Sequence, residues 1–318
     1  MSAIRTRILP TSYEQAERDK RNRQRNKNFT IAAFTLPGMI LFVLFVLMPI
    51  VQSVLFSFYD WDGFGPPTDF IGLDNYDRLL NHSVFQLSLA HTLTIMTLSL
   101  LIQLPLALGL ALLVGRGKLR AKGFFRAVLF IPYVFSEVIT AIIWRYVLSP
   151  GGGLVNQVLG TFIPGYEPIG WLAERDLVLY AYFAVLTWKY FGFHMILYMA
   201  GLQGIPKDLE DAARIDGATE MDVLRHVTLP LLGATIRLTI FLSVVGSFQQ
   251  FVLVWVLTQG GPANASDVIG TYLYKFGIQR FQLGYGSAIA IVLFVITFVF
   301  SLVYQRLVMR QDNQISRI

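Results

Sequence analysis

The chain has 318 residues, of which 54% are hydrophobic and only 14% are Asp, Glu, Lys or Arg. Soluble domains carry about 25% charged residues, so this composition argues against a soluble globular protein. The sequence contains no Cys, which excludes disulfides and thiolate metal sites. Its net charge of +6 fits a nucleic-acid-binding protein only if the basic residues form one face or one run.

Six segments are long and apolar enough to cross a membrane, which takes about 20 residues for a hydrocarbon core of about 30 Å. In chain order they are 29–59, 85–115, 127–148, 177–202, 236–258 and 287–304. The first two contain no Asp, Glu, Lys or Arg at all. Buried helices of a soluble core cannot supply six such lengths in a chain of this size. The sequence therefore predicts an all-α integral membrane protein with six transmembrane helices.

The basic residues predict the orientation of these helices. Nineteen Lys and Arg residues lie in the N-terminal tail, in the loop 115–126, in the segment 203–230 and after residue 304, whereas the alternate loops hold four. The positive-inside rule places the nineteen in the cytoplasm. We therefore expect a multi-pass protein with both termini cytoplasmic. Basic residues that are spread over membrane-flanking loops form no nucleic-acid-binding face, so we expect lipid and no nucleic acid as a partner.

The distribution of apolar and polar segments predicts four parts of the chain. They are a basic tail over 1–28, the first transmembrane helix with its outer loop over 29–84, a five-helix domain over 85–308 and a second tail over 309–318. The outer loops are acidic or rich in Gly and Pro, as turns are. We find no clear internal repeat and no clear sign of broken helices.

A long polar segment, 206–230, separates the fourth and fifth apolar runs. Pro206 suits the first turn of a helix. The acidic residues that follow it also indicate the start of a helix there, because negative charge near the N-terminus is favoured by the helix dipole. Gly217 is typical of the residue that follows a helix, and Thr219 with Asp222 resembles a capping box for a second helix. A connection between two spans needs only a few residues, so two short helices joined by a sharp turn are more structure than a connection requires. A docking surface for another protein is the better interpretation.

Four stretches of the sequence resemble one family. The segment LEDAARIDGATEMDVLRHVTLPLL resembles the EAA motif of bacterial ABC importer permeases. The stretches SFYDWDGFGPPTDFIGLDNYDRLL, FRAVLFIPYVFSEVITAIIWRYVLSP and FVLVWVLTQGGP are similar to signatures of the carbohydrate permeases in that group. The resemblance covers residues 30–310 and points to the first permease subunit of maltose-type and glycerol-phosphate-type importers. It implies the type I ABC importer permease fold with a cytoplasmic coupling helix, in the prokaryotic cytoplasmic (inner) membrane.

The resemblance also implies partners and a coupling site. The partners are a second, different permease subunit, two cytoplasmic ATPase domains and an extracytoplasmic sugar-binding protein. The residues that match the coupling motif are Glu210, Asp211, Ala212, Ala213, Asp216, Gly217 and Ala218. Asp211 departs from the family, which usually has Glu there, and it would pair with a basic residue of the ATPase. The chain has no phosphate-binding G-x-x-x-x-G-K-[ST] loop, so we expect no enzymatic activity in it, with ATP and Mg²⁺ on the ATPase.

Two charged residues lie about halfway along their predicted spans, Glu137 in the third and Lys189 in the fourth. A charge at the bilayer centre costs about 2.5–3.5 kcal/mol on insertion scales, which favours either an ion pair or a wet cavity. The sequence leaves both alternatives open, a structural pair away from the solute and a pair that contacts the solute.

Polar and aromatic residues of the fourth and fifth spans predict a sugar pathway, because sugars present both apolar C–H faces and hydroxyl groups. Carried over from maltose-type permeases, the lining positions are Tyr190, Phe193, Ser243, Gly246, Ser247 and Gln250. Ser243, Ser247 and Gln250 are spaced four and three residues apart, so they share one helix face. We expect Gln249 to face away and His194 to serve packing.

The sequence favours a di- or oligosaccharide as the solute. A phosphorylated polyol such as glycerol phosphate is the weaker alternative, because Lys189 is the only basic residue available for it. A stand-alone secondary transporter would show repeats and broken helices and would leave the segment 206–230 unexplained. An intramembrane enzyme would need a catalytic constellation, and none is visible in the sequence.

Overall fold

A computed structural model describes residues 12–115 and 121–309. Three parts of the expected organisation lie outside the described residues, namely 1–11 of the basic tail, 116–120 of the basic loop and 310–318 of the second tail. The chain divides into two compact units, Met1–Leu55 and Phe56–Ile318. The second unit thus includes the loop that follows the first apolar run.

The first unit consists of one helical run in its described part. α1, Ser12–Phe42, continues through the π-helical turn η1, Val43–Leu47, into α2, Met48–Phe56. The run begins well before the apolar stretch, so the described part of the basic tail is helical. Apolar side chains such as Phe34 and Phe45 are 84% and 75% exposed, which suits a helix surrounded by lipid.

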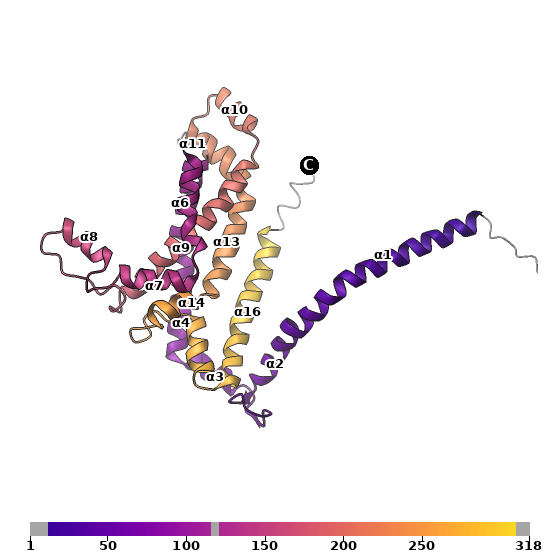
Figure 1. Ribbon diagram of the computed structural model, residues 1–318, viewed down its shortest axis with the longest axis horizontal. Coiled ribbons are helices and arrows are strands. Elements are labelled where there is room, and N and C mark those ends of the chain that lie inside the picture. The colour runs from indigo at the N-terminus through magenta and orange to yellow at the C-terminus, as the bar shows by residue number, and fades with distance from the viewer. Residues whose placement is uncertain (1–11, 116–120, 310–318) are drawn as a thin grey trace, which may run out of the picture. The chain divides into compact units, whose positions relative to one another are not determined.

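The second unit is a bundle of long helices with short elements at its ends and α8, Leu154–Phe162, standing out at one side (Figure 1). The long helical runs are α4 (Ser83–Leu98) with η2 (Ser99–Gln103) and α5 (Leu104–Gly115), α6 (Lys122–Val134) with α7 (Glu137–Val147), α9 (Val178–Gln203), α13 (Gly233–Phe248) with α14 (Val252–Thr258), and α16 (Leu283–Leu307). The short elements are β1 (Tyr59–Asp60), β2 (Asp69–Phe70), α3 (Asp74–Asn81), α8 (Leu154–Phe162), α10 (Lys207–Ile215), α11 (Glu220–Val223), η3 (Leu224–Thr228), α12 (Leu229–Leu231), α15 (Ile269–Leu273) and η4 (Tyr274–Ile278). α10 and α11 lie at one end of the bundle and α3 at the other (Figure 1).

Three described helices are long and apolar enough to cross a membrane, Asp19–Phe56, Ser83–Gly115 and Leu283–Leu307. Two further pairs of helices, Lys122–Val134 with Glu137–Val147 and Glu220–Leu231 with Gly233–Phe248, are each bent at a short break. If each pair is counted as one span, the number rises to five. α9, which corresponds to the expected span 177–202, is not among them. About half of its residues are buried, with Tyr182, Val185 and Met195 fully buried, and it carries several polar residues. The structure therefore supports several membrane spans without confirming the count of six.

Two of the expected spans are broken helices, contrary to the expectation of unbroken ones. α6 and α7 meet at an angle of 98° at Phe135 and Ser136. Ser136 begins α7 as an N-cap, because its side chain accepts a hydrogen bond from the backbone N–H of Ile139 at 3.2 Å. The run 236–258 is interrupted at residues 249–251, between α13 and α14. Pro132 lies within the last turn of α6, where the missing N–H weakens the helix.

Polar contacts fix the short elements at the α3 end of the bundle. β1 and β2 form a two-stranded antiparallel sheet with Tyr59 opposite Phe70. Asn75 of α3 is buried, and its side-chain amide donates to the carbonyl oxygens of Ser57 and Tyr59 at 2.9 and 3.0 Å. One asparagine thereby anchors the helix α3 to the segment that leads into β1.

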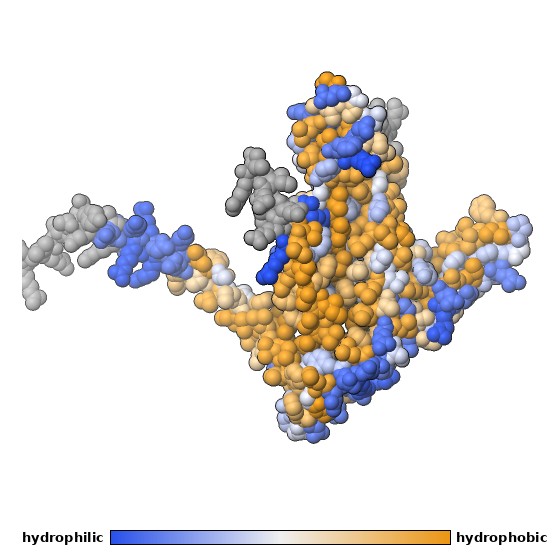
Figure 2. All heavy atoms as spheres, turned by 180° about the vertical axis from the view of Figure 1, so that it is seen from behind, coloured by the Kyte–Doolittle hydropathy of each residue, from blue (hydrophilic) through white to orange (hydrophobic). Residues whose placement is uncertain are grey.

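The surface of the bundle has the polarity of a membrane protein. Apolar side chains cover the middle of the second unit, and hydrophilic residues gather at its ends (Figure 2). Inside the bundle, α6 and α9 lie so close that a Cβ on Gly192 would meet the backbone carbonyl of Leu129. Glycine is required there because only it allows the two backbones to approach.

Candidate functional site

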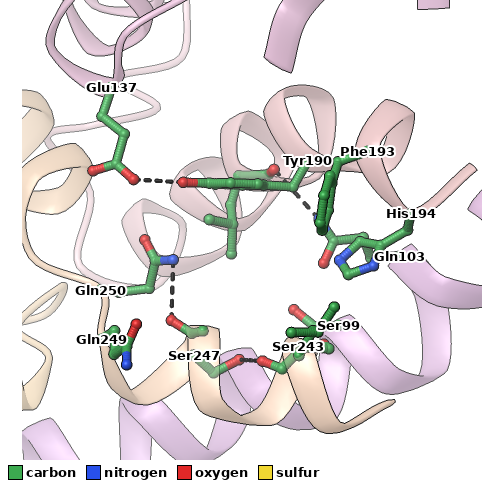
Figure 3. Close-up of a pocket in the computed structure, with 13 residues that line it drawn as sticks. Ser99, Gln103, Glu137, Tyr190, Phe193, His194, Ser243, Ser247, Gln249 and Gln250 are labelled. Atoms are coloured by element: carbon green, nitrogen blue, oxygen red, sulfur yellow. Dashed lines mark hydrogen bonds between the residues drawn. The ribbon is translucent and has the colours of Figure 1, made fainter. Parts of the chain in front are cut away.

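A cavity of about 290 Å³ lies inside the second unit, between α7, α9, α13 and the junction of α4 with η2 (Figure 3). Its lining is mostly uncharged and polar or aromatic. The lining residues are Ser99, Gln103, Glu137, Leu186, Tyr190, Phe193, His194, Leu242, Ser243, Gly246, Ser247, Gln249 and Gln250. Seven of the eight residues predicted to contact a solute are among them, and Lys189 is the exception.

The polar stripe of α13 forms one wall of the cavity with three of the predicted residues, Ser243, Gly246 and Ser247. Gln250 also lines the cavity, but it lies two residues beyond the end of α13 and not on the helix face that the spacing predicted. Ser247 donates to the carbonyl oxygen of Ser243 at 2.8 Å. The Gln250 carbonyl group accepts from the hydroxyl of Tyr182 at 2.8 Å, while its amide nitrogen donates to the Gly246 carbonyl at 3.2 Å. These bonds hold the Gln250 side chain in one orientation at the end of α13.

Aromatic rings from α9 form the opposite wall. Tyr190 and Phe193 line the cavity, and the ring of Phe193 stacks on that of Tyr133 with centroids 4.8 Å apart. Stacking fixes the ring planes, because it leaves these side chains few alternative rotamers. Rigid aromatic faces opposite hydroxyl and amide groups suit a solute that is apolar on one face and hydroxylated at its edges.

Glu137 and Lys189 make separate contacts at the break between α6 and α7. Tyr190 donates from its hydroxyl to a carboxylate oxygen of Glu137, and the Lys189 ammonium donates to the backbone carbonyl of Phe135. Lys189 is only 4% exposed, and its nitrogen lies 5.3 Å from the centre of the Tyr190 ring. The carboxylate faces the cavity, whereas the ammonium caps the carbonyl that follows α6. The two residues thus have different hydrogen-bond partners in the described structure, and a contact of either residue with the solute stays a prediction.

Sequence reasoning missed four polar residues of the lining. Ser99 and Gln103 belong to η2, a π-helical turn that turns two polar side chains of an apolar helix toward the cavity. His194 was expected to serve packing, yet it lines the cavity one turn beyond Tyr190. Gln249 was expected to face away and lies in the lining instead, because α13 ends at Phe248 and the helical register stops there. No periodic signal in the sequence marks either the π-turn or the end of α13.

The polar segment after α9 folds as its sequence predicts. α10 begins directly after Pro206, and Gly217 takes a positive φ of 90°, the conformation expected of a glycine after a helix. Thr219 and Asp222 form a capping box at the start of α11. Hydrogen bonds from the Thr219 side chain and backbone hold the pKa of Asp222 below its ordinary value.

The two adjacent acidic residues of α10 differ in their surroundings. Glu210 is buried and accepts a hydrogen bond from the hydroxyl of Thr228 at 2.8 Å, which ties α10 to η3. The Asp211 side chain is 64% exposed and lies 2.8 Å from Arg214, which also pairs with Glu220 at 2.8 Å. These partners, Glu220 first, raise the pKa of the Arg214 guanidinium. Glu210 therefore stabilises the local fold, and Asp211 is the carboxylate presented to the surroundings.

The other residues of the predicted coupling site lie on the same surface. Ala212, Asp216 and Gly217 are exposed, and Ala213 and Ala218 are half-buried. Ile215 is 85% exposed and Met221 67% exposed, so apolar side chains are presented beside the charged ones. A surface of this kind is typical of a protein contact.

Comparisons with known proteins agree with these features. Residues 103–313 match a family described as the binding-protein-dependent transport system inner membrane component. The chain is 33% identical to the probable ABC transporter permease protein YurN of Bacillus subtilis (strain 168), over 88% of this chain and 97% of that protein. It is 30% identical to the diacetylchitobiose uptake system permease protein NgcF of Streptomyces coelicolor, over 91% of this chain and 86% of that one. It is also 33% identical to the lactose transport system permease protein LacF of Rhizobium radiobacter, over 84% and 90%.

Solved structures give the same picture of the fold. A chain of a bacterial ABC transporter that imports the acidic polysaccharide alginate superposes with a TM-score of 0.79 at 26% identity, covering 92% of this chain and 99% of that one. A second structure of a bacterial alginate ABC transporter contains a periplasmic protein with a bound alginate pentasaccharide, and one of its chains also superposes with a TM-score of 0.79.

Proposed function

We propose, since this chain belongs to the family of inner-membrane components of binding-protein-dependent transport systems, that it is a permease subunit of an ATP-driven carbohydrate importer. The observation that carries the proposal is the cavity, whose aromatic wall faces a wall of hydroxyl and amide groups. Relatives named for diacetylchitobiose and lactose transport support a di- or oligosaccharide as the solute.

The charge of the cavity favours a neutral sugar. Among its lining residues in the described part of the chain, none is Lys or Arg, and Glu137 contributes a carboxylate. A phosphate group would meet this carboxylate without a cationic partner, which argues against a glycerol-phosphate-type solute. The same carboxylate disfavours an acidic polysaccharide of the alginate kind.

We expect this subunit to work within a complex. A second permease subunit would complete the pathway, two cytoplasmic ATPase domains would bind ATP and Mg²⁺, and an extracytoplasmic protein would deliver the sugar. The alginate transporter with its periplasmic protein supports the last of these partners. The basic tail and the segment with α10 would then face the cytoplasm, and α3 the outside.

The chain connectivity suggests how ATP-driven motion reaches the sugar. α10 follows α9 after a link of three residues, 204–206, and leads through α11, η3 and α12 into α13. α9 and α13 supply the two facing walls of the cavity. An ATPase domain that binds α10 and moves it therefore displaces both walls of the cavity together. Rocking of whole helices about a central binding site is a known transport mechanism. Secondary transporters also have broken helices. The breaks between α6 and α7 and between α13 and α14 are compatible with this mechanism too, because whole helices move in it.

The sugar assignment is tested by reconstituting the complete complex in proteoliposomes with its binding protein. We expect ATP-dependent uptake of at least one sugar among labelled lactose, maltose and diacetylchitobiose, and none of glycerol 3-phosphate. Uptake of glycerol 3-phosphate in place of all three sugars would contradict the assignment.

The coupling site is tested by the Asp211→Lys variant. Because Asp211 is an exposed carboxylate on α10, reversal of its charge should reduce co-purification of the ATPase by about tenfold or more, as for a truncated charge pair at an interface. The control is Glu167→Lys, an exposed position in the loop after α8, which should co-purify the ATPase normally. Equal recovery of the ATPase with both variants would contradict a role of α10 in coupling.

A further inference from the structure

The cavity has two polar ends that differ in their chemistry. Glu137, Gln249 and Gln250 lie at one end, and His194, Gln103 and Ser99 lie at the other (Figure 3). The ring of Tyr190 lies between them, and Phe193 lies beside His194 (Figure 3). Glu137 and Gln250 of the first end belong to the predicted sugar site, whereas the residues of the second end come from η2 and from a histidine that the sequence assigned to packing.

His194 stands out at the second end because one of its two ring nitrogens has no hydrogen-bond partner among the described residues. The side chain is 5% exposed, and its Nδ1 has no hydrogen-bond partner among the described residues. The hydroxyl of Ser243, which lines the same cavity and is 6% exposed, also lacks a partner there. Buried polar groups in native proteins are nearly always paired. Both residues line the cavity, so a molecule bound there can supply the missing partners.

A sugar hydroxyl is a suitable partner for both groups. A hydroxyl donates one hydrogen bond and accepts two, so it can serve an imidazole nitrogen and a serine hydroxyl at once. Ser99 and Gln103 are spaced four residues apart on η2 and add a hydroxyl and an amide oxygen from a further helix, while the Gln103 amide nitrogen donates to the Leu186 carbonyl at 3.4 Å. π-helical turns of this kind occur often at functional sites.

We propose that His194, with Ser99 and Gln103, forms a second solute subsite that binds a hydroxyl group of the transported sugar at the α10 end of the cavity. The proposal rests on the proposed function, since it takes a sugar as the solute. His194 lies four residues after Tyr190 on α9, about 6 Å further along the helix axis. A solute that spans both ends therefore needs hydroxyl groups on either side of its apolar face, as a disaccharide has.

The test uses the reconstituted complex with its binding protein, and the sugar among lactose, maltose and diacetylchitobiose that the wild type transports. Uptake is measured for that sugar and for each of its monodeoxy derivatives, after the binding protein has been shown to bind the derivative. The variants are His194→Phe, which keeps a ring without nitrogen atoms, and His194→Asn, which keeps a polar group near the position of Nδ1.

In the wild type, removal of one particular hydroxyl should lower uptake by about tenfold, as for the loss of one hydrogen bond to a buried group. In His194→Phe the parent sugar and that derivative should be taken up at equal rates, and His194→Asn should restore part of the difference. If the ratio of the uptake rates of parent sugar and derivative is the same in all three proteins, the inference is overturned. A bound water or side-chain packing then accounts for the unpaired nitrogen of His194. If the wild type transports none of the sugars, the proposed function fails, and this inference fails with it.

Discussion

Two charged residues, the buried Lys189 and the half-buried Glu137, illustrate how single residues are accommodated inside the bundle. Lys189 donates to the Phe135 carbonyl next to the end of α6, where a positive charge is favoured by the helix dipole. Glu137 occupies the first turn of α7, where a negative charge is favoured for the same reason. The helix break thus provides a local partner for each charge. Glu137 retains a place in the cavity, whereas Lys189 supports the break itself.

We predict that Lys189→Met destabilises the protein more than Glu137→Gln does. Methionine cannot donate to the Phe135 carbonyl, and loss of a hydrogen bond to a charged group costs about 1.5–3 kcal/mol. Glutamine at position 137 still accepts from the Tyr190 hydroxyl. The free energy of unfolding in mixed detergent and SDS micelles measures both effects. A Lys189→Met protein as stable as the wild type would show that the ammonium does not support the break.

At the scale of the elements, the sequence predicts what depends on local rules and misses what depends on packing. The turn at Gly217 and the capping box at Thr219 follow from residues next to them in the chain, and both are found in the structure. The end of α13 and the π-turn η2 were missed, because the sequence predicts 236–258 and 85–115 each as one continuous α-helical span. The bend between α6 and α7 had a local signal that could have been used, Pro132 followed by the N-cap Ser136.

The close approach of α6 and α9 gives a prediction about one element pair. Gly192→Ala places a Cβ against the Leu129 carbonyl, so the two helices must separate, and overpacking of this kind costs about 1–3 kcal/mol. Gly109→Ala on α5 is the matched control, because a Cβ there meets nothing within 4 Å. The control should keep its stability or gain up to about 1 kcal/mol. Unfolding in mixed micelles compares the two, and equal stabilities would contradict the close packing described above.

At the scale of the whole molecule, the order of the elements along the chain links the two sites. The exposed α10 is joined on one side to α9 and on the other, through α11, η3 and α12, to α13. Residues such as Tyr190 and Ser247 of these two helices face each other across the cavity. The sequence predicted most of these lining residues through family resemblance and the spacing on α13. It missed the contribution of η2, since a third helix enters the cavity only once the bundle is assembled.

Passage of the solute through this cavity is tested most directly by the Gly246→Trp variant. Gly246 lines the cavity, and a Cβ added to it meets nothing within 4 Å, so the indole should fill the space without displacing the helices. The measurement is ATP-dependent sugar uptake by the reconstituted complex, with Gly109→Trp as a control at an open position outside the lining. We predict that Gly246→Trp assembles with its partners and that its uptake falls by about tenfold or more, because a pocket must enclose most of the surface of its ligand. Undiminished uptake by an assembled Gly246→Trp complex would place the solute pathway elsewhere.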